Sequence, residues 1–342
     1  MADGVSVIIC CHNGASRMPV TLEHLQAQQP PAAPWEVLVI DNASTDGTTE
    51  VVRSCWQDGP APLRIIDESR LGVRFARERG LREARFEFLG FIDDDNWVAH
   101  DWVRTAYHIM SPDSELGAVG SIREPACEVS SPAWFEDFHS SYAILTEQDL
   151  KQMHGPVDWL PTAGLCVRKA AWDRLIKHGF RSQLTGTVGQ KLQGGEDTEL
   201  TIALRLSGWK LTVDTRLRLK HFMPAQRLRW IYLRKLLRGY AASHVTLDAY
   251  TEYSLSLPPG PRRWLSERWW YQLGKSMRHI ASRPHALMST LLSHAEGRNE
   301  VIEIEQQFGR LLGLLQLRGR YGALRRDLRN ALWRHCDPPR CF

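Results

Sequence analysis

The first ~120 residues alternate short β-rich runs with stretches of helical periodicity, and this alternation restricts the fold more than any other feature of the chain. Such alternation is typical of βαβ units, whose parallel strands are covered by helices on both faces. The predicted strands are 5–10, 35–40, 63–67, 86–92 and 116–121, and the predicted helices between them are 18–28, 48–55, 72–83 and 101–110. The sequence therefore predicts an α/β fold with a mostly parallel, Rossmann-like sheet flanked by helices.

The predicted strands end in polar residues, among them HNGAS after the first strand, DNASTDGT after the second and DDDN after the fourth. Strand ends in such a sheet face a common crevice, where ligands bind. Three adjacent carboxylates, Asp93, Asp94 and Asp95, repel one another and resist losing water unless a cation or a polar ligand replaces it. Oxygen-only clusters suit Mg²⁺ or Mn²⁺, which commonly take one or two carboxylates together with substrate phosphates. We therefore expect a divalent cation and a phosphate-bearing ligand here; the alternative is an acidic turn that caps the next helix.

The pattern changes beyond residue 124. Residues 124–157 are irregular, and 160–175 predict a strand that enters a helix. The Gly- and Thr-rich stretch 182–195 predicts a mobile loop, which we expect to order over a bound ligand. The run EDTELTIALRLSG has helical periodicity, and the two runs after it, WKLTVD and LRLKHF, predict two short strands.

After His221 the composition becomes helical and basic, with helical runs to about Arg334 and a break at 256–263. We therefore predict a ligand-binding domain over 1–225 and a helical, basic region over 226–342. The segment 225–244 carries five Lys and Arg residues without one acid, and it spaces apolar residues as one face of a helix. Such a helix could lie on an anionic bilayer, or it could pack its apolar stripe against its own domain. The apolar residues of this stripe are Trp230, Leu233, Leu237 and Tyr240.

The composition limits where the chain works and what it binds. Its 342 residues include 43 basic and 39 acidic ones, and its seven cysteines lack the spacing of a metal site or a disulfide framework, which favours a reducing cytoplasm. The N-terminus lacks the basic lead-in of a signal peptide, and no window reaches the roughly 20 apolar residues of a membrane span. We therefore expect a soluble, cytoplasmic protein, at most peripheral at the inner face of a membrane. No nucleic-acid-binding module is recognisable, so we expect no nucleic-acid partner. The last helices could form a homo-oligomer contact.

Five motifs in this order, HNGAS, VIDNASTDGT, RLGVRFARERGLREA, FIDDDN and GGEDTEL, together resemble family 2 glycosyltransferases of the GT-A fold. The resemblance covers roughly residues 4–225. It implies an inverting hexosyltransferase that moves a sugar from a nucleoside-diphosphate sugar, usually a UDP-sugar, to a hydroxyl of a glycan, lipid-linked or protein acceptor. It also implies Mn²⁺ or Mg²⁺ as cofactor, and a role in polysaccharide, glycolipid or glycoprotein assembly.

The resemblance also implies roles for single residues. The acids of FIDDDN match the family's DXD motif, in which Asp95 would bind the metal and Asp93 or Asp94 would face the ribose or metal-bound water. His221 falls where several relatives carry a further metal ligand. Asp197 would be the catalytic base, with Glu196 beside it in the ED motif. The residues expected near the nucleotide are His12, Asn13, Asp41, Asn42, Ser44, Arg70 and Arg77, and those expected on the acceptor side are Trp134 and Trp159.

Elementary chemistry agrees with a base at Asp197, because a helix N-terminus keeps a carboxylate ionised and ready to take a proton from an acceptor hydroxyl. The pair Glu196–Asp197 could also merely complement the helix dipole. Two other functions stay open on this kind of sheet. One is a sugar nucleotidyltransferase, which usually needs a Gly- and Arg-rich loop after the first strand, where CCHNGASRMP is a poor version. The other is a non-catalytic protein that binds sugars or nucleotides.

Overall fold

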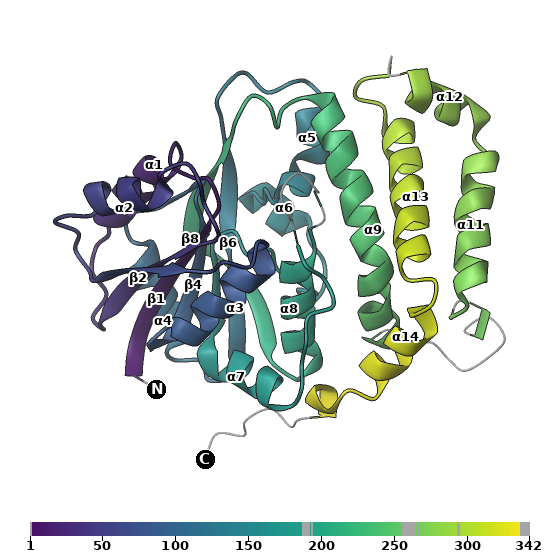
Figure 1. The fold of residues 1–342 in the computed structure, drawn as a ribbon. Helices are drawn as coiled ribbons and strands as arrows, with labels where there is room; N and C mark the ends of the chain where they lie inside the picture. The colour runs from purple at the N-terminus through teal and green to yellow at the C-terminus, as the bar shows by residue number, and fades with distance from the viewer. Residues whose placement is uncertain are drawn as a thin grey trace.

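The computed structural model describes residues 2–186, 192, 194–254, 264–265, 267–292 and 295–335. Its centre is an eight-stranded sheet with the strand order β3-β2-β1-β4-β7-β6-β8-β5 (Figure 1). The strands are β1 (Ala2–Cys11), β2 (Trp35–Asp41), β3 (Leu63–Asp67), β4 (Phe86–Asp93), β5 (Asn96–Val98), β6 (Leu116–Cys127), β7 (Leu165–Arg168) and β8 (Lys210–Met223). The helices around it are α1 (Met18–Gln26), α2 (Thr48–Cys55), α3 (Val73–Glu83), α4 (Trp102–Met110), α5 (Phe135–Phe138), α6 (Glu147–Gln152), α7 (Lys169–Lys177) and α8 (Glu196–Leu206).

Strands β1 to β4 form the predicted parallel half of the sheet: β1 pairs with β2 and β4, and β2 pairs with β3. Successive residues of β1 point to opposite faces, so Ile8 packs in one hydrophobic cluster while Val7 and Ile9 pack in another. The first cluster includes residues of α3, α7 and α8, and the second includes residues of α1, α2 and α4. Helices therefore cover both faces, as the near-continuous apolar runs of these strands predict.

The other half of the sheet mixes strand directions. Strand β7 is antiparallel to β4 and β6, β5 is antiparallel to β8, and β6 and β8 are parallel. The prediction of two short strands at 209–214 and 217–222 is wrong, because β8 is one strand. Its pairing with β6 shifts after Asp214, which lies opposite Ser121, while Arg218 lies opposite Ile122. The polar residues of this irregularity interrupt the apolar pattern without ending the strand.

The predicted C-terminal helical region is confirmed, and its helices α9, α13 and α11 stand side by side next to the sheet (Figure 1). The bounds are α9 (Trp230–Ser254), α11 (Trp269–Ala281), α12 (Pro284–Leu292), α13 (Asn299–Gln316) and α14 (Tyr321–Arg329). One hydrophobic cluster joins Phe135 and Phe138 of α5 with Leu233 of α9 and Ile302 of α13. Side chains from both sides of the predicted boundary at residue 225 therefore share one core. The predicted break at 256–263 lies outside the described residues.

The segment 225–244 packs against its own protein, which corrects the alternative of a membrane-bound helix. Trp230, Leu233 and Leu237 are buried, and Arg234 and Arg238 form ion pairs with the fully buried Glu305 of α13. Its apolar stripe is thus covered, and two of its cations are neutralised internally. Among the described residues, no helix combines the length and the apolar character that crossing a bilayer requires.

Candidate active site

The three acids Asp93–Asp95 form the tight turn between β4 and β5. The side chain of Asn96 holds this turn, because its Oδ1 accepts a hydrogen bond of 3.1 Å from the backbone N–H of Asp93. Strand β5 pairs with β8 so that Asn96 lies opposite His221. This pairing, which the sequence did not predict, brings a histidine from far along the chain to the acid turn.

Two of the acids are already paired with arginines. Asp94 accepts hydrogen bonds from Arg17, the shorter being 2.6 Å to Nη2. Asp95, with 3% of its surface exposed, accepts a 2.8 Å hydrogen bond from Arg227, and its Oδ1 lies 3.4 Å from Nε2 of His221. Burial alone would raise the pKa of Asp95, but His221 and Arg227 outweigh it and hold that pKa below its usual range. Asp95 is therefore the acid of the turn that stays ionised.

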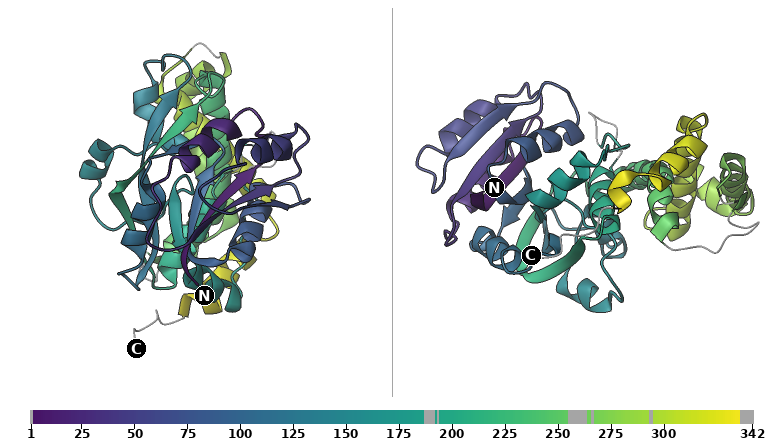
Figure 2. Two further views of the ribbon diagram at one scale, coloured as in Figure 1. Left: turned by 90° about the vertical axis from the view of Figure 1, so that its left-hand side faces the viewer. Right: turned by 90° about the horizontal axis from the view of Figure 1, so that it is seen from below.

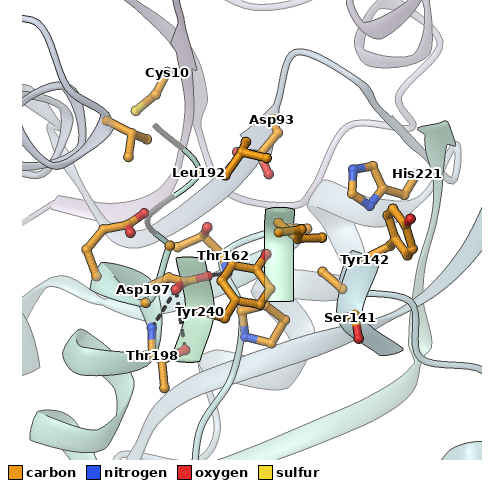
Figure 3. Close-up of a pocket in the computed structure, with 18 of the residues that line it drawn as sticks. Cys10, Asp93, Ser141, Tyr142, Thr162, Leu192, Asp197, Thr198, His221 and Tyr240 are labelled. Atoms are coloured by element: carbon orange, nitrogen blue, oxygen red, sulfur yellow. Dashed lines mark hydrogen bonds between the residues drawn. The ribbon is translucent and has the colours of Figure 1, made fainter. Parts of the chain in front are cut away.

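Asp93 differs from its neighbours, because its carboxylate forms no hydrogen bond with any of the described residues and faces a cavity (Figure 3). Burial raises the pKa of Asp93 to about 6, and Arg77 opposes that rise. Asp93 is only partly buried, but a carboxylate that loses part of its water without gaining a hydrogen-bond partner is still destabilised unless a ligand supplies one. Asp93 is thus the member of the turn most available to a bound molecule.

The second acidic pair opens α8. Glu196 forms an ion pair with Arg77, and Arg77 also donates a 2.7 Å hydrogen bond to Oγ1 of Thr162. Burial raises the pKa of Glu196 to about 7, and the positive charge of Arg77 opposes that rise. Asp197 accepts a 2.7 Å hydrogen bond from the backbone N–H of Thr198 and a weaker one, 3.4 Å, from that of Thr162. Glu196 is therefore tied to Arg77, whereas Asp197 keeps its carboxylate towards the cavity.

Helix α9 lies directly against the backbone that leads to these acids. A Cβ atom at Gly194 would come within 2.4 Å of the Tyr240 ring, so only glycine fits there. Gly195 has a φ of 108°, in the region that favours glycine, where the chain turns into α8. The two glycines before the acids thus allow α9 to form a wall of the site.

Both groups of acids line one cavity of about 850 Å³ (Figure 3). Ten of the residues predicted from the sequence line it: His12, Asn42, Arg77, Asp93, Asp94, Asp95, Trp159, Glu196, Asp197 and His221. Asn42 holds the loop before α3 at the cavity, because its side chain bonds the backbone of Glu68, Arg70 and Gly72. The structure therefore brings the acid turn, the histidine and the ED pair together.

Four of the other predicted residues do not line the cavity. Asn13, Asp41 and Ser44 bond to one another across two loops: the backbone N–H of Asn13 donates to Oγ of Ser44, and the backbone N–H of Ser44 donates to Asp41. Asp41 also accepts a hydrogen bond from Thr49. Arg70 forms an ion pair with Glu68 and is half exposed. These residues hold the loops around the cavity in place.

Trp134 is a correction to the predicted acceptor side. It is buried, its ring packs edge-on against Trp230, and its Nε1 donates a 2.8 Å hydrogen bond to Glu296. The ring is part of the core between α5 and the C-terminal helices and is absent from the cavity lining. Trp159 differs, because it lines the cavity and 49% of its surface is exposed. The residue type alone could not show that one tryptophan is in the core and the other lines the cavity.

Several lining residues were not assigned to the site from the sequence: Arg17, Tyr142, Arg227, Tyr232 and Tyr240. Helical spacing did place Tyr240 on the apolar stripe of its segment, but spacing does not reveal what a stripe packs against. Burial raises the pKa of Tyr240, and Asp197 contributes to that rise. The phenol of Tyr240 and the carboxylate of Asp197 therefore share one corner of the cavity (Figure 3).

The side chains of Asp95 and His221, at the acid turn, are of the kind and spacing that a divalent cation requires of its ligands. Nδ1 of His221 is buried without a hydrogen-bond partner among the described residues, and Nε2 lies 3.4 Å from Asp95. Adjacent ligands of an octahedral ion with bonds of about 2.1 Å are about 3 Å apart, which is close to that spacing. No three His, Cys, Asp or Glu side chains among the described residues gather into a complete metal cage. Such a site suits Mg²⁺ or Mn²⁺, which commonly takes its remaining ligands from phosphates and water.

The fold and the acids at the sheet edge define a class of protein, and comparisons place the chain in it. Residues 6–174 match Glycosyl transferase family 2. The chain belongs to this family, as the ordered motifs predicted. Its fold resembles that of the mannosyltransferase PcManGT from Pyrobaculum calidifontis, solved in complex with GDP-Man and Mn²⁺. The TM-score is 0.57 at 18% identity, over 94% of this chain and 88% of that chain. The predicted GT-A fold with a C-terminal helical region is confirmed.

Two curated relatives are similar in sequence. Validoxylamine A glucosyltransferase of Streptomyces hygroscopicus subsp. jinggangensis (strain 5008) is 28% identical over 234 residues, which cover 61% of this chain and 53% of the relative. Succinoglycan biosynthesis protein ExoM of Rhizobium meliloti (strain 1021) is 23% identical over 224 residues, which cover 64% of this chain and 68% of ExoM. The chain thus spans about half the length of the first relative.

Proposed function

We propose that the protein is a metal-dependent, inverting glycosyltransferase that moves a sugar from a nucleoside-diphosphate sugar, such as a UDP-sugar, to an acceptor hydroxyl. The observation that carries this proposal is the shared cavity: the turn Asp93–Asp95 with His221 and the separate carboxylate of Asp197 line the same cavity of about 850 Å³. The reaction needs both parts, a place for the charged diphosphate and a proton acceptor that the diphosphate does not occupy.

The sugar donor would lie along the edge of the sheet. Its nucleobase would contact His12 and the loop that Asn42 holds, and Asp93 would accept a hydrogen bond from the ribose. A divalent cation, Mn²⁺ or Mg²⁺, would be held by Asp95 and His221 and would offset the charge that the departing diphosphate gains. Arg227, which donates a hydrogen bond to Asp95 and lines the cavity, would add a second positive charge near the phosphates.

Asp197 would act as the base. Its carboxylate takes the proton of the acceptor hydroxyl as the acceptor oxygen bonds to the anomeric carbon. The bond from that carbon to the diphosphate breaks on the opposite face, and the electron pair leaves with the diphosphate. Two backbone N–H groups, those of Thr198 and Thr162, orient the carboxylate for this step. A single displacement of this kind inverts the anomeric centre.

The acceptor would approach past Trp159, Tyr232 and Tyr240. Trp159 is half exposed and lines the cavity, and an aromatic face suits the apolar side of a sugar ring. Glycans, sugars linked to lipids and glycosylated proteins all present such a ring, and all three remain candidates.

The test is release of the nucleoside diphosphate from a panel of UDP- and GDP-sugars, with Mn²⁺, with Mg²⁺ and with a chelator. We expect release to require a metal ion and to rise when a matching glycan acceptor is added. Asp197→Asn should lower turnover by about 10²–10⁴-fold and leave nucleotide affinity nearly unchanged, because the base acts in the transition state. Asp95→Ala should instead weaken metal-linked nucleotide binding, measured by calorimetry.

The matched control is Asp67→Asn, because Asp67 also ends a parallel strand but is exposed and does not line the cavity. This variant should keep wild-type turnover and binding. Equal turnover of Asp197→Asn and wild type would remove Asp197 as the base. Nucleotide-sugar binding without any release would favour a non-catalytic binding protein, and release of pyrophosphate from a nucleoside triphosphate with a sugar phosphate would favour a nucleotidyltransferase.

A further inference from the structure

Helix α11 packs Trp269 and Leu273 against the core of its own layer, yet it also leaves large apolar side chains exposed to solvent, which that packing does not require. Its buried positions include Gln272 and Ser276, which are 9% and 3% exposed. On the opposite side, Trp270, Tyr271 and Met277 are 55%, 38% and 57% exposed. Trp270 and Met277 are seven residues apart and so lie on the same side of the helix, and Tyr271 is displaced from Trp270 by about 100° around the helix axis.

Helix α12 continues the same arrangement. It buries Ala286 and Thr290, whereas Met288, Leu291 and Leu292 are each more than half exposed. Single exposed apolar residues are ordinary, but six large ones on two successive helices mark an interaction surface. We call these six residues, Trp270, Tyr271, Met277, Met288, Leu291 and Leu292, the outer apolar face.

The charged residues that α11 and α12 themselves contribute are all basic. Between Arg268 and Ala295 the chain contains four Lys and Arg residues and no acid. Lys275 and Arg278 stand among the exposed residues of α11 and form no ion pair with any described residue. Arg283, at the start of α12, is paired with Glu303. The cations that accompany the outer apolar face thus remain available to an outside anion.

The position of the two helices leaves this face open to a large partner. Helix α11 is the outermost helix of the C-terminal layer, on the side away from the sheet, and α12 follows it at one end (Figures 1 and 2). The layer contacts the rest of the protein chiefly through α9, with further contacts from α13 and from the segment after α14, whereas α11 packs on α13 and α12. A broad, flat partner can therefore reach α11 without meeting the sheet domain.

We propose that the outer apolar face docks onto the surface of an anionic lipid bilayer. Trp, Tyr, Met and Leu side chains would enter the boundary between headgroups and acyl chains, while Lys275 and Arg278 would contact the anionic headgroups. A second copy of this chain is disfavoured as the occupant, because a two-fold contact through this face would bring its uncompensated positive charges together. The proposal is independent of the sugar donor and of the acceptor.

The test is co-sedimentation of the full chain with vesicles of phosphatidylglycerol and of phosphatidylcholine, at low and at high salt. We expect at least about tenfold stronger partitioning onto phosphatidylglycerol, weakened by salt. The double variant Lys275→Glu with Met277→Gln should lose most of that partitioning. The matched control is Lys151→Glu with Met153→Gln, which makes the same two changes at the same spacing on exposed residues at and just after α6.

Thermal unfolding of each variant checks that it folds as the wild type does, and Leu291→Gln on α12 provides a second variant should the first one fail to fold. Loss of partitioning in the outer-face variants, with the control unchanged, supports the docking surface. Equal partitioning of the outer-face variants and wild type overturns it, as does equal binding to both lipids. A dimer in sedimentation velocity that Lys275→Glu with Met277→Gln dissociates would overturn it in favour of a contact between copies.

Discussion

Helices α9 and α11 have similar compositions and opposite surroundings. Both carry aromatic, Leu and basic residues, yet Trp230 and Leu233 of α9 are buried while Trp270 and Met277 of α11 are exposed. The Arg234 and Arg238 cations of α9 are neutralised by Glu305, whereas Lys275 of α11 forms no ion pair with any of the described residues. The first helix became a wall of the site, and the second became an outer surface.

This difference shows that the composition of an apolar and basic helix does not by itself decide where the helix packs or what it does. Helix α9 contacts the segment before the ED acids, where Gly194 lets the Tyr240 ring approach the backbone. The main contacts of helix α11 are with α13 and α12, which belong to its own layer. The same residue types therefore line the cavity in one place and, as proposed, contact a bilayer in the other.

The largest effect that can test this comparison is on stability. Glu305→Gln should lower the free energy of unfolding by about 3–5 kcal/mol, because it leaves two arginines facing a neutral group, one of them, Arg234, itself buried. Urea unfolding of the variant and of the wild type measures this change in the free energy of unfolding. The control is Glu303→Gln on the same helix, because the Glu303 side chain is 47% exposed and its ion pair with Arg283 contributes about 0–1 kcal/mol. Equal losses in the two variants would contradict the internal role of the α9 cations.

The second effect is on the pH dependence of transfer. The pKa of Glu196 is about 7, so this group is ionised above that pH and neutral below it. Activity should therefore fall as the pH drops below about 7, because Arg77 loses its ionised partner. Glu196→Gln should lower turnover at pH 8 by about tenfold and remove this step from the profile of kcat against pH. An unchanged inflection in the variant would assign the step to another group.

The raised pKa of Glu196 also has a consequence for stability. The folded protein binds the proton of Glu196 more tightly than the unfolded chain does. Protonation of Glu196 therefore stabilises the folded state, and this stabilisation is fully present below the ordinary pKa of 4.5. That contribution is lost as the pH rises through about 7. Unfolding measured at pH 5 and at pH 8 should therefore show a smaller difference in Glu196→Gln than in the wild type.

The smallest effect concerns one hydroxyl on each helix. Tyr240→Phe should lower turnover by about three- to tenfold, the worth of one hydrogen bond near the reacting atoms, and leave the unfolding midpoint nearly unchanged. Tyr271→Phe on α11 is the control, because Tyr271 is exposed and distant from the cavity lining. It should change neither quantity. A loss of turnover in Tyr271→Phe would show that the two helices are not separable in the way proposed.

Much of the sheet was predictable, because its signals are local. The parallel strands β1 to β4 and the helices between them follow from short-range periodicity, and their observed bounds lie close to the predicted ones. The acids of the turn Asp93–Asp95 could be chosen in advance because they follow a predicted strand, and the ED pair could be chosen because it opens a predicted helix and matches a motif of the family that the chain resembles. Strand β5 was missed and β8 was predicted as two strands instead of one, since a three-residue strand and an irregular pairing leave little periodicity to detect.

The sequence by itself determined the order of the elements and which acids gather at the edge of the sheet, because both follow from residue types within a few positions. Only the tertiary structure decided that Arg227 meets Asp95, that Trp134 is core and Trp159 is not, and that α9 is covered while α11 is exposed. The physical reason is that a helical period defines a stripe of side chains but not its surroundings. What covers a stripe depends on segments far away along the chain.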